Sequence, residues 1–242
     1  TVKNLTRRFD IMGFALLSLA LGAFQLMLDR GSTQDWFNSN EIIISLILAC
    51  LSFYLFMIHL LTTRHPFLEP AMFKDRNYVT SLVFMFVMGI VLLATMALLP
   101  PYLQGLMGYP VITTGLVLAP RGVGTMLAMI IAGRTIGKID ARLLILGGIL
   151  LTAYSLWDMS LFAPDVPESL IIKTGLIQGF GLGFVFIPLS TLAYKTLPGQ
   201  YRNDAASIFS LVRNIGSSIG ISVMFAMLSS YTQINHAELG AN

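Results

Sequence analysis

Seven apolar stretches of roughly 20 residues follow one another along the 242-residue chain, and they limit its fold more than any other feature. Each stretch is long enough to cross the hydrocarbon core of a bilayer as a helix. Charged residues make up only 11% of the chain, against about 25% in soluble domains. We place the spans at about 11–28, 41–62, 78–100, 111–136, 142–163, 170–194 and 205–232. The sequence therefore predicts an all-α, polytopic membrane helix bundle.

Lysine and arginine collect in the connections on one side of these spans. Eleven of the 15 are found there: Lys3, Arg7, Arg8, Arg64, Lys74, Arg76, Arg134, Lys138, Arg142, Lys195 and Arg202. The connections on the other side hold Arg30 and Lys173. Because basic residues stay in cytoplasmic loops, we expect the N-terminus in the cytoplasm and the C-terminus outside. This pattern fits a multi-pass protein of the inner or plasma membrane, surrounded by lipid and not by nucleic acid.

Two arginines lie inside the apolar spans, where a cation costs about 2.5 to 3.5 kcal/mol. Arg121 stands at the centre of its span, and Arg213, beside Asn214, belongs to the last span. At about 100° per residue, one narrow face of that span carries Ser210, Arg213, Ser217 and Gly220. Both cations should therefore face protein or a hydrated interior. A structural contact with neighbouring helices and a position on a transport path both remain open for each.

Other polar residues add candidates for a substrate path. Tyr102 and Gln104 follow Pro100-Pro101 at the outer end of the third span, where an aromatic belt is the simpler explanation. In the sixth span, glycines at 175, 179 and 183 form a close-packing stripe beside Gln178. The substrate-path candidates are Tyr102, Gln104, Arg121, Gln178, Arg213 and Asn214.

Several kinds of chemistry have no visible position in the sequence. No Asp or Glu lies near the middle of a span, His59 is expected at the membrane interface, and no metal-ligand spacing surrounds it. Phosphate-binding and hydrolase motifs are also absent from the sequence. We therefore expect neither catalytic nor metal-binding residues, no cofactor, and a function other than that of an enzyme.

Four blocks of sequence resemble one known family, and they are spread along the chain from residue 28 to residue 220. They are LDRG to DWF at 28–37, HPFLEPAMFKDRNY at 65–78, LPPYLQGLMGYPVITTGLVLAPRGVGTM at 99–126, and GFGLGFVFIPLSTLAYKTLP to RNIGSSIG at 179–220. In this order they resemble the drug:proton antiporters of the major facilitator superfamily. The closer resemblance is to the fourteen-span EmrB/QacA group.

This resemblance implies a domain organisation and a mechanism. Residues 1–77 would be two extra membrane helices with their connectors, and 78–242 a second helix bundle without its last helix. The first six helices would then lie in a part of the protein outside this chain. The family's mechanism is alternating access around a midplane site, in which proton entry drives the export of lipophilic drugs. The proton gradient would be the energy source, and a periplasmic adaptor and an outer-membrane channel the partners.

The family resemblance also extends to the connection GRTIGKIDAR at 133–142, which is similar to a cytoplasmic gating loop. It differs from the family pattern because Gly137 stands where Asp is usual and Asp140 where Gly is usual. The gating-loop candidates are Arg134, Lys138, Asp140 and Arg142.

Three other functions could account for a protein with seven membrane spans. A retinal protein needs a lysine in its last span, and 205–232 contains none, while the expected orientation is the reverse of a seven-helix receptor. A non-transporting scaffold would have no use for two intramembrane arginines. Within transporters, the alternative is export of a specific metabolite, lipid or siderophore by the same fold.

Overall fold

The computed structural model describes residues 10–31, 33–34, 36–63, 66 and 68–241, with side chains up to residue 231. Seven of its helices are long and apolar enough to cross a membrane. They are α1 (Ile11–Gly31), α2 (Asn40–Thr62), α3 (Arg76–Pro101), α4 (Val111–Thr135), α5 (Ala141–Ser160), α6 (Glu168–Lys195) and α7 (Arg202–Ala241). The prediction of an all-α bundle with seven membrane helices is thus confirmed for the described part of the chain. Of the basic residues used for orientation, Lys3, Arg7, Arg8 and Arg64 lie outside it.

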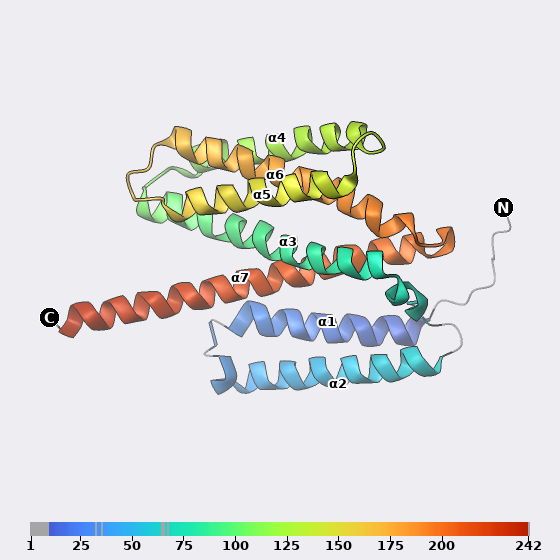
Figure 1. Ribbon diagram of the computed structural model, residues 1–242. Coiled ribbons are helices and arrows are strands. Elements are labelled where there is room, and N and C mark those ends of the chain that lie inside the picture. The colour runs from blue at the N-terminus through green and yellow to red at the C-terminus, as the bar shows by residue number, and fades with distance from the viewer. Residues whose placement is uncertain (1–9, 32, 35, 64–65, 67, 242) are drawn as a thin grey trace.

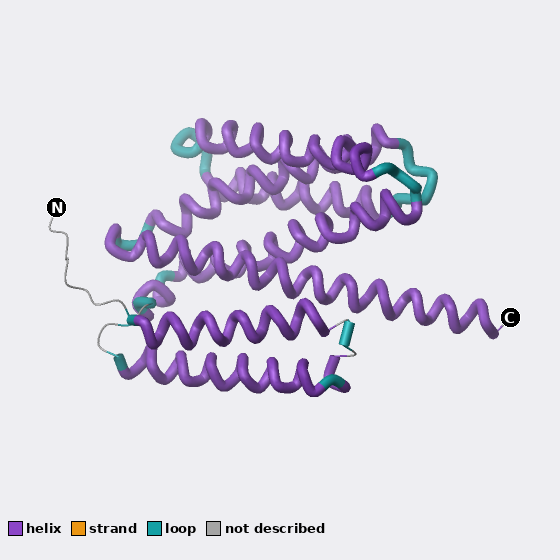
Figure 2. Tube along the Cα trace, turned by 180° about the vertical axis from the view of Figure 1, so that it is seen from behind, coloured by secondary structure: helices purple, strands orange, loops and turns teal. Residues whose placement is uncertain are grey.

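The helices run roughly side by side in a row, and α5 lies against α6 (Figure 1). α4 packs on α6, α6 packs on α3, and α3 packs on α7, while α5 covers α6. The hairpin of α1 and α2 lies beside α7 at the other edge of the row, as the view from behind also shows (Figure 2). The connections from α3 to α4 and from α5 to α6 share one end of the bundle, which we call the α3–α4 end. α7 projects beyond the other helices at that end.

Close helix crossings explain why glycine recurs in these spans. A Cβ atom on Gly179 of α6 would collide with the carbonyl oxygen of Arg121 in α4, and one on Gly183 would lie 2.6 Å from the carbonyl oxygen of Thr125. The stripe predicted from the sequence is therefore a real contact between backbones. α3 and α7 also pack closely at a glycine, since a Cβ on Gly89 would collide with the carbonyl oxygen of Arg213. In lipid the hydrophobic effect does not drive helices together, so close packing of this kind is a main source of helix–helix association.

Hydrogen bonds join α3, α6 and α7 at the end opposite the α3–α4 connection. Asp75 caps α3 by accepting from the backbone amides of Asn77 and Tyr78 at 2.8 and 3.2 Å. A side-chain hydrogen bond with Thr196, at the end of α6, lowers the pKa of Asp75, burial raises it, and the two amides lower it again. The buried Tyr78 hydroxyl donates to the carbonyl oxygen of Ala205 in α7 at 2.9 Å.

Two details differ from the sequence-based expectations about helix ends. The third span does not end at Pro100-Pro101 but continues through both prolines into a π-helical turn, η3 (Tyr102–Leu106). In this turn the amide of Met107 donates to the carbonyl oxygen of Tyr102, five residues earlier, at 3.3 Å. The last helix reaches Ala241, beyond the expected end near 232.

His59 was expected at the membrane interface, and the structure gives it a specific partner. Its Nε2 lies 2.8 Å from Oδ1 of Asp10, which also accepts from the amide of Gly13 at the start of α1. The pair therefore joins the start of α1 to the end of α2. Near the same end of the bundle, a short helix, η2 (Pro70–Lys74), buries Met72 completely.

Candidate functional site

Three polar side chains from three helices meet at one depth in the bundle. Arg121 lies ten residues after the start of α4, and Gln178 ten residues after the start of α6. Thr95 lies eleven residues before the end of η3 at Leu106. At 1.5 Å per residue, all three are about 15 Å from the α3–α4 end, the middle of a bilayer core about 30 Å thick.

Arg121 is the charged member of this group, and its side chain crosses from α4 to α3. Nη2 donates to Oγ1 of Thr95 at 2.8 Å and to the carbonyl oxygen of Leu92 at 3.2 Å. Only 7% of Arg121 is exposed. Among the described residues no ion pair joins it to a carboxylate. The positive charge is thus stabilised by dipoles and not by an opposite charge.

Gln178 completes the group from α6, which packs against both other helices. Its Nε2 donates to Oγ1 of Thr95 at 3.4 Å, so Thr95 accepts from the glutamine and the arginine together. Gln178 is fully buried, and within the described structure its Oε1 has no hydrogen-bond partner. A buried acceptor without a partner costs about 1–3 kcal/mol, so this atom needs a specific explanation. We call Arg121, Thr95 and Gln178 the midplane cluster.

The glycine stripe of α6 explains how Arg121 can reach α3. Because Gly179 has no side chain, the two backbones meet at Arg121 itself. A Cβ on the neighbouring Gly175 would lie 3.8 Å from the Cβ of Arg121, an ordinary contact. The arginine therefore leaves α4 at the point where α4 and α6 cross, and its guanidinium reaches α3.

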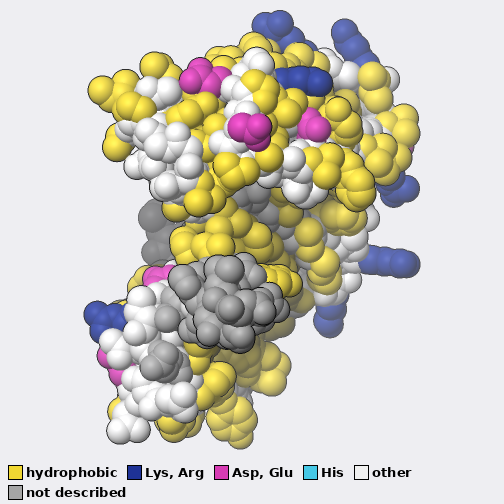
Figure 3. Space-filling model, turned by 90° about the vertical axis from the view of Figure 1, so that its left-hand side faces the viewer, with side chains coloured by type: hydrophobic (Ala, Val, Ile, Leu, Met, Phe, Trp, Pro, Cys, Tyr) yellow, Lys and Arg dark blue, Asp and Glu magenta, His cyan; other side chains and the backbone are white. Residues whose placement is uncertain are grey.

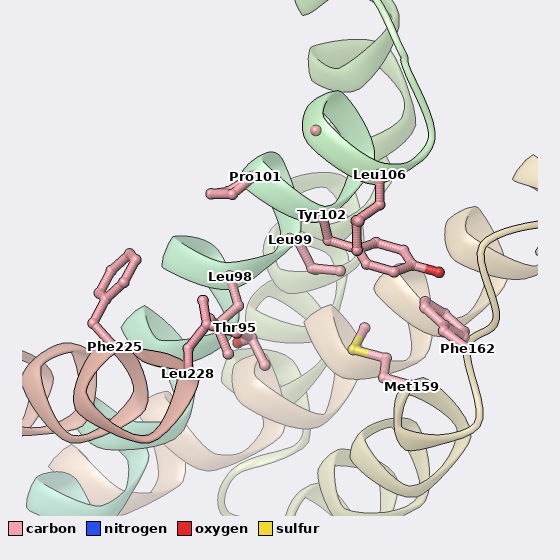
Figure 4. Close-up of a pocket in the computed structure, with 11 residues that line it drawn as sticks. Thr95, Leu98, Leu99, Pro101, Tyr102, Leu106, Met159, Phe162, Phe225 and Leu228 are labelled. Carbon is pink, nitrogen blue, oxygen red and sulfur yellow. The ribbon is translucent and has the colours of Figure 1, made fainter. Parts of the chain in front are cut away.

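An apolar chamber of about 650 Å³ opens between α3, α5 and α7 near the α3–α4 end (Figure 4). Its lining is formed by Thr95, Leu98, Leu99, Pro101, Tyr102, Gly105, Leu106, Met159, Phe162, Phe225 and Leu228. Only Thr95 and Tyr102 bring polar side-chain atoms to this lining. Its size and apolar character are typical of small-molecule sites. Because Thr95 belongs to the chamber and to the midplane cluster, one side chain connects the two.

Tyr102 and Gln104, the two candidates at the outer end of the third span, lie differently relative to the chamber. The Tyr102 hydroxyl donates to the carbonyl oxygen of Ala163 at 2.6 Å, and its ring stacks on Phe162 with centroids 6.4 Å apart. Tyr102 therefore shapes the chamber wall. Gln104 is exposed and does not line the chamber. Seen from this end, the molecule presents many hydrophobic side chains, with several acidic and basic side chains among them and at the edges (Figure 3).

The residues of the polar face predicted on the last span differ in how deeply the structure buries them. Ser217 is buried, and its hydroxyl lies 3.1 Å from the carbonyl oxygen of Gly89 in α3. Ser210 and Asn214 are exposed, and Arg213 is half-buried. Arg213 thus packs its backbone against α3 but does not join the midplane cluster. The two intramembrane cations are placed separately and need not share a role.

The four gating-loop candidates lie together where α4 ends and α5 begins, at the opposite end from the chamber. Arg134, Lys138, Asp140 and Arg142 are all exposed. Asp140 caps α5 by accepting from the backbone amide of Arg142 at 3.0 Å. Gly137 makes the tight turn with a φ of 97°, which favours glycine. The glycine that departs from the family pattern therefore has a backbone role in this chain.

Sequence reasoning missed Thr95 and Leu92, which provide the acceptors for Arg121. A signal for Thr95 was present, because it is the only hydroxyl residue between Ser81 and Tyr102 in an otherwise apolar span. Nothing could have identified Leu92, since it contributes only a backbone carbonyl. A helix normally uses that carbonyl internally.

Comparison with known proteins gives one family and a set of named relatives. The profile of the Major Facilitator Superfamily matches residues 11–221. The probable multidrug resistance protein EmrY of Escherichia coli is 32% identical over 235 residues, which are 97% of this chain and 46% of that protein. The multidrug export protein EmrB of Haemophilus influenzae is 33% identical, with 95% of this chain and 45% of that protein covered. The fatty acid resistance protein FarB of Neisseria gonorrhoeae is 34% identical, with coverages of 94% and 45%. The chain thus spans a little under half the length of these relatives.

Proposed function

The chain belongs to the major facilitator superfamily, and from that premise we propose that it forms part of a proton-coupled exporter of lipophilic small molecules. It is a multi-pass membrane protein with a transport family's fold and not an enzyme's. The observation that carries the proposal is the midplane cluster. A cation near the middle of the bilayer, without a carboxylate partner among the described residues, is the kind of group that lines ion and substrate paths.

The names of the relatives indicate the direction of transport and the class of substrate that we propose. EmrY and EmrB are named for multidrug resistance and export, so we infer export of several lipophilic compounds. Flexible methionine and large apolar surfaces suit varied ligands, and Met159 with Phe162 and Phe225 lines the chamber. The alternative, export of one lipid-like class, is favoured by the name of the fatty acid resistance protein.

The proposed arrangement follows the family. α1 and α2, with residues 1–77, would be the two additional helices, and residues 78–242 part of the second bundle. The α3–α4 end would face outward, and the loop with Arg134, Lys138, Asp140 and Arg142 would take part in gating on the cytoplasmic side of the inner membrane. Rocking of this bundle against a partner bundle would expose the midplane site to each side in turn, driven by the proton gradient. A periplasmic adaptor and an outer-membrane channel are the partners we propose.

The test is transport by the natural protein at its full natural length, in an efflux-deficient bacterial host. We expect cells to accumulate less of a fluorescent lipophilic drug, and an uncoupler that collapses the proton gradient to restore accumulation. Arg121→Gln should impair export at matched expression, whereas Lys173→Gln, an exposed cation on α6, should not. Equal accumulation with and without the transporter would refute the proposal, and unchanged export in Arg121→Gln would leave Arg121 a purely structural role.

A further inference from the structure

The helices α4, α5 and α6 form one tightly packed block. A Cβ on Gly124 of α4 would lie 2.6 Å from the carbonyl oxygen of Leu176 in α6. One on Gly148 of α5 would lie 2.6 Å from the carbonyl oxygen of Gly181, also in α6. α6 therefore meets α4 and α5 backbone to backbone on two of its sides. Backbone contacts cannot adapt by a change of side-chain rotamer, so we expect these three helices to move together.

α3 and α7 form a second block of the same kind. A Cβ on Gly216 of α7 would collide with the carbonyl oxygen of Phe86 in α3, and one on Gly220 would lie 2.8 Å from that of Ile90. The Ser217 hydroxyl, between these two glycines, lies 3.1 Å from a carbonyl oxygen of α3. All of these contacts reach α3 at or before Ile90. They therefore hold the body of α3 and not its outer end.

The two blocks are joined in one half of the bundle and separated in the other. In the half away from the α3–α4 end, α3, α6 and α7 share one hydrophobic core, to which Leu82, Leu189 and Phe209 belong. At the midplane, Arg121 reaches from α4 to α3. Beyond this point the apolar chamber lies between the blocks, with α3 and α7 on one side and α5 on the other (Figure 4). The half that contains the chamber is therefore the part in which the blocks can approach or separate.

The outer end of α3 continues into η3, which is held by the first block and not by the second. Leu103 of η3 is completely buried in a hydrophobic cluster with Val117 of α4 and Ile171 of α6. The Tyr102 hydroxyl donates to the carbonyl oxygen of Ala163, between α5 and α6. We call η3, with the ends of α4, α5 and α6 that adjoin it, the outer cap.

Pro100 and Pro101 stand between the body of α3, held by α7, and the outer cap. Neither proline has an amide hydrogen, so the carbonyl oxygens of Met96 and Ala97 have no helical donor four residues later. The chain is still helical here, since Pro101 has a φ of −60° and a ψ of −37°. Two consecutive missing hydrogen bonds make a helix easier to bend. Because Pro101 also lines the chamber, bending at this point changes the shape of the chamber wall.

We propose that α3 bends at Pro100-Pro101, and that the outer cap thereby moves toward and away from α7 and narrows or widens the chamber. The half joined by the shared core stays fixed, so the motion is confined to one half of one bundle. It is separate from the rocking of two bundles proposed above. In an exporter, a chamber of variable width would accommodate apolar molecules of different size. That use rests on the proposed function, whereas the hinge can be measured without any transport.

The test is double electron–electron resonance between spin labels on the full-length protein in lipid nanodiscs, in a cysteine-free background that includes Cys50→Ser. One pair, Leu161→Cys with Ser229→Cys, spans the chamber from the outer cap to α7. The control pair, Leu161→Cys with Ile112→Cys, lies within the outer cap and shares one label. All three side chains are exposed. We expect the first pair to give a distance distribution at least about twofold broader than the control pair, because a hinge alters only distances across it.

Replacing the prolines tests the position of the hinge. Pro100→Ala with Pro101→Ala gives α3 two more amide donors, so it should narrow the Leu161–Ser229 distribution to the width of the control pair. Pro120→Ala is the matched control, because it removes a proline inside α4, and it should leave both distributions unchanged. The comparison of the two pairs in the natural protein needs no proline variant, so it decides even if the double variant does not fold. Equal widths for the two pairs, or a broad distribution that persists in the folded double variant, would overturn the proposal.

Failure of the hinge and failure of the proposed function are distinguishable. An exporter of lipophilic drugs with equally narrow distributions for both pairs would refute the hinge alone. A protein whose chamber varies in width as described, but which exports nothing, would retain the hinge and refute the function.

Discussion

The crossing of α4 and α6 allows a prediction in which two neighbouring glycines behave oppositely. A Cβ on Gly179 would collide with the carbonyl oxygen of Arg121, and it would also lie 3.0 Å from the amide nitrogen of Thr125. Both obstacles are backbone atoms, so the helices can only separate. A Cβ on Gly175 meets one atom, the Cβ of Arg121, at 3.8 Å. Gly175→Ala is therefore the matched control, on the same helix and the same stripe.

The magnitudes follow from two opposing effects. Replacing glycine by alanine favours a helix by up to about 1 kcal/mol at either position. Overpacking costs about 1–3 kcal/mol, and it applies only at Gly179. Gly175→Ala should therefore be neutral or slightly stabilising. Gly179→Ala should lose up to about 2 kcal/mol net, because the overpacking cost exceeds the gain in helix propensity.

Thermal unfolding of the purified full-length protein, followed by size-exclusion chromatography after heating, measures the difference. At about 2–4 °C per kcal/mol for a domain of this size, the apparent midpoint of Gly179→Ala should fall several degrees below that of Gly175→Ala. Because Arg121 leaves α4 at this crossing, Gly179→Ala should also impair transport. If the two variants have equal midpoints, backbone contact at Gly179 does not limit the approach of α4 and α6.

Three further predictions concern the ends of the helices. Tyr78→Phe removes the side-chain donor to the buried carbonyl oxygen of Ala205 and should cost about 1 kcal/mol, seen as a lower thermal midpoint than in the natural protein. Asp75 has a pKa below its ordinary 3.8, so its charged form stabilises the fold at neutral pH and this contribution is lost as the pH falls through the lowered pKa. Thr196→Val should therefore raise the pKa of Asp75, and nuclear magnetic resonance of the carboxyl carbon measures that value. Gly137→Ala, at a φ of 97°, should cost about 1 kcal/mol and increase proteolysis of the α4–α5 connection.

The number and type of elements could be predicted because a single physical demand controls them. In a bilayer, each backbone amide and carbonyl must be paired within its own span, so length and hydropathy are sufficient to identify helices. The glycine stripe of α6 was also readable, since only small residues permit helices to approach closely. The passage of α3 through Pro100-Pro101 into a π-helical turn was not, because proline is more often found at the end of a helix than inside one.

At the candidate site, too, the sequence predicts some features and only the tertiary structure shows the others. Sequence identified Arg121 and Gln178 as polar residues in apolar spans, but not that both bind one oxygen of Thr95. It grouped Arg213 with Arg121 as the second intramembrane cation, whereas Arg213 is half-buried against α3 and away from the cluster. Helical periodicity gives the face of a residue on its own helix. It does not say which neighbouring helix covers that face.

Sequence by itself determined that this chain has seven spans long and apolar enough to cross a membrane, and that two cations inside these spans must face protein or water, because polar groups in hydrocarbon are costly. Tertiary structure decided which groups provide the shelter. The helices pack in an order that the chain does not follow, and three residues 26 to 83 positions apart come within hydrogen-bonding distance only because α3, α4 and α6 meet at the same depth.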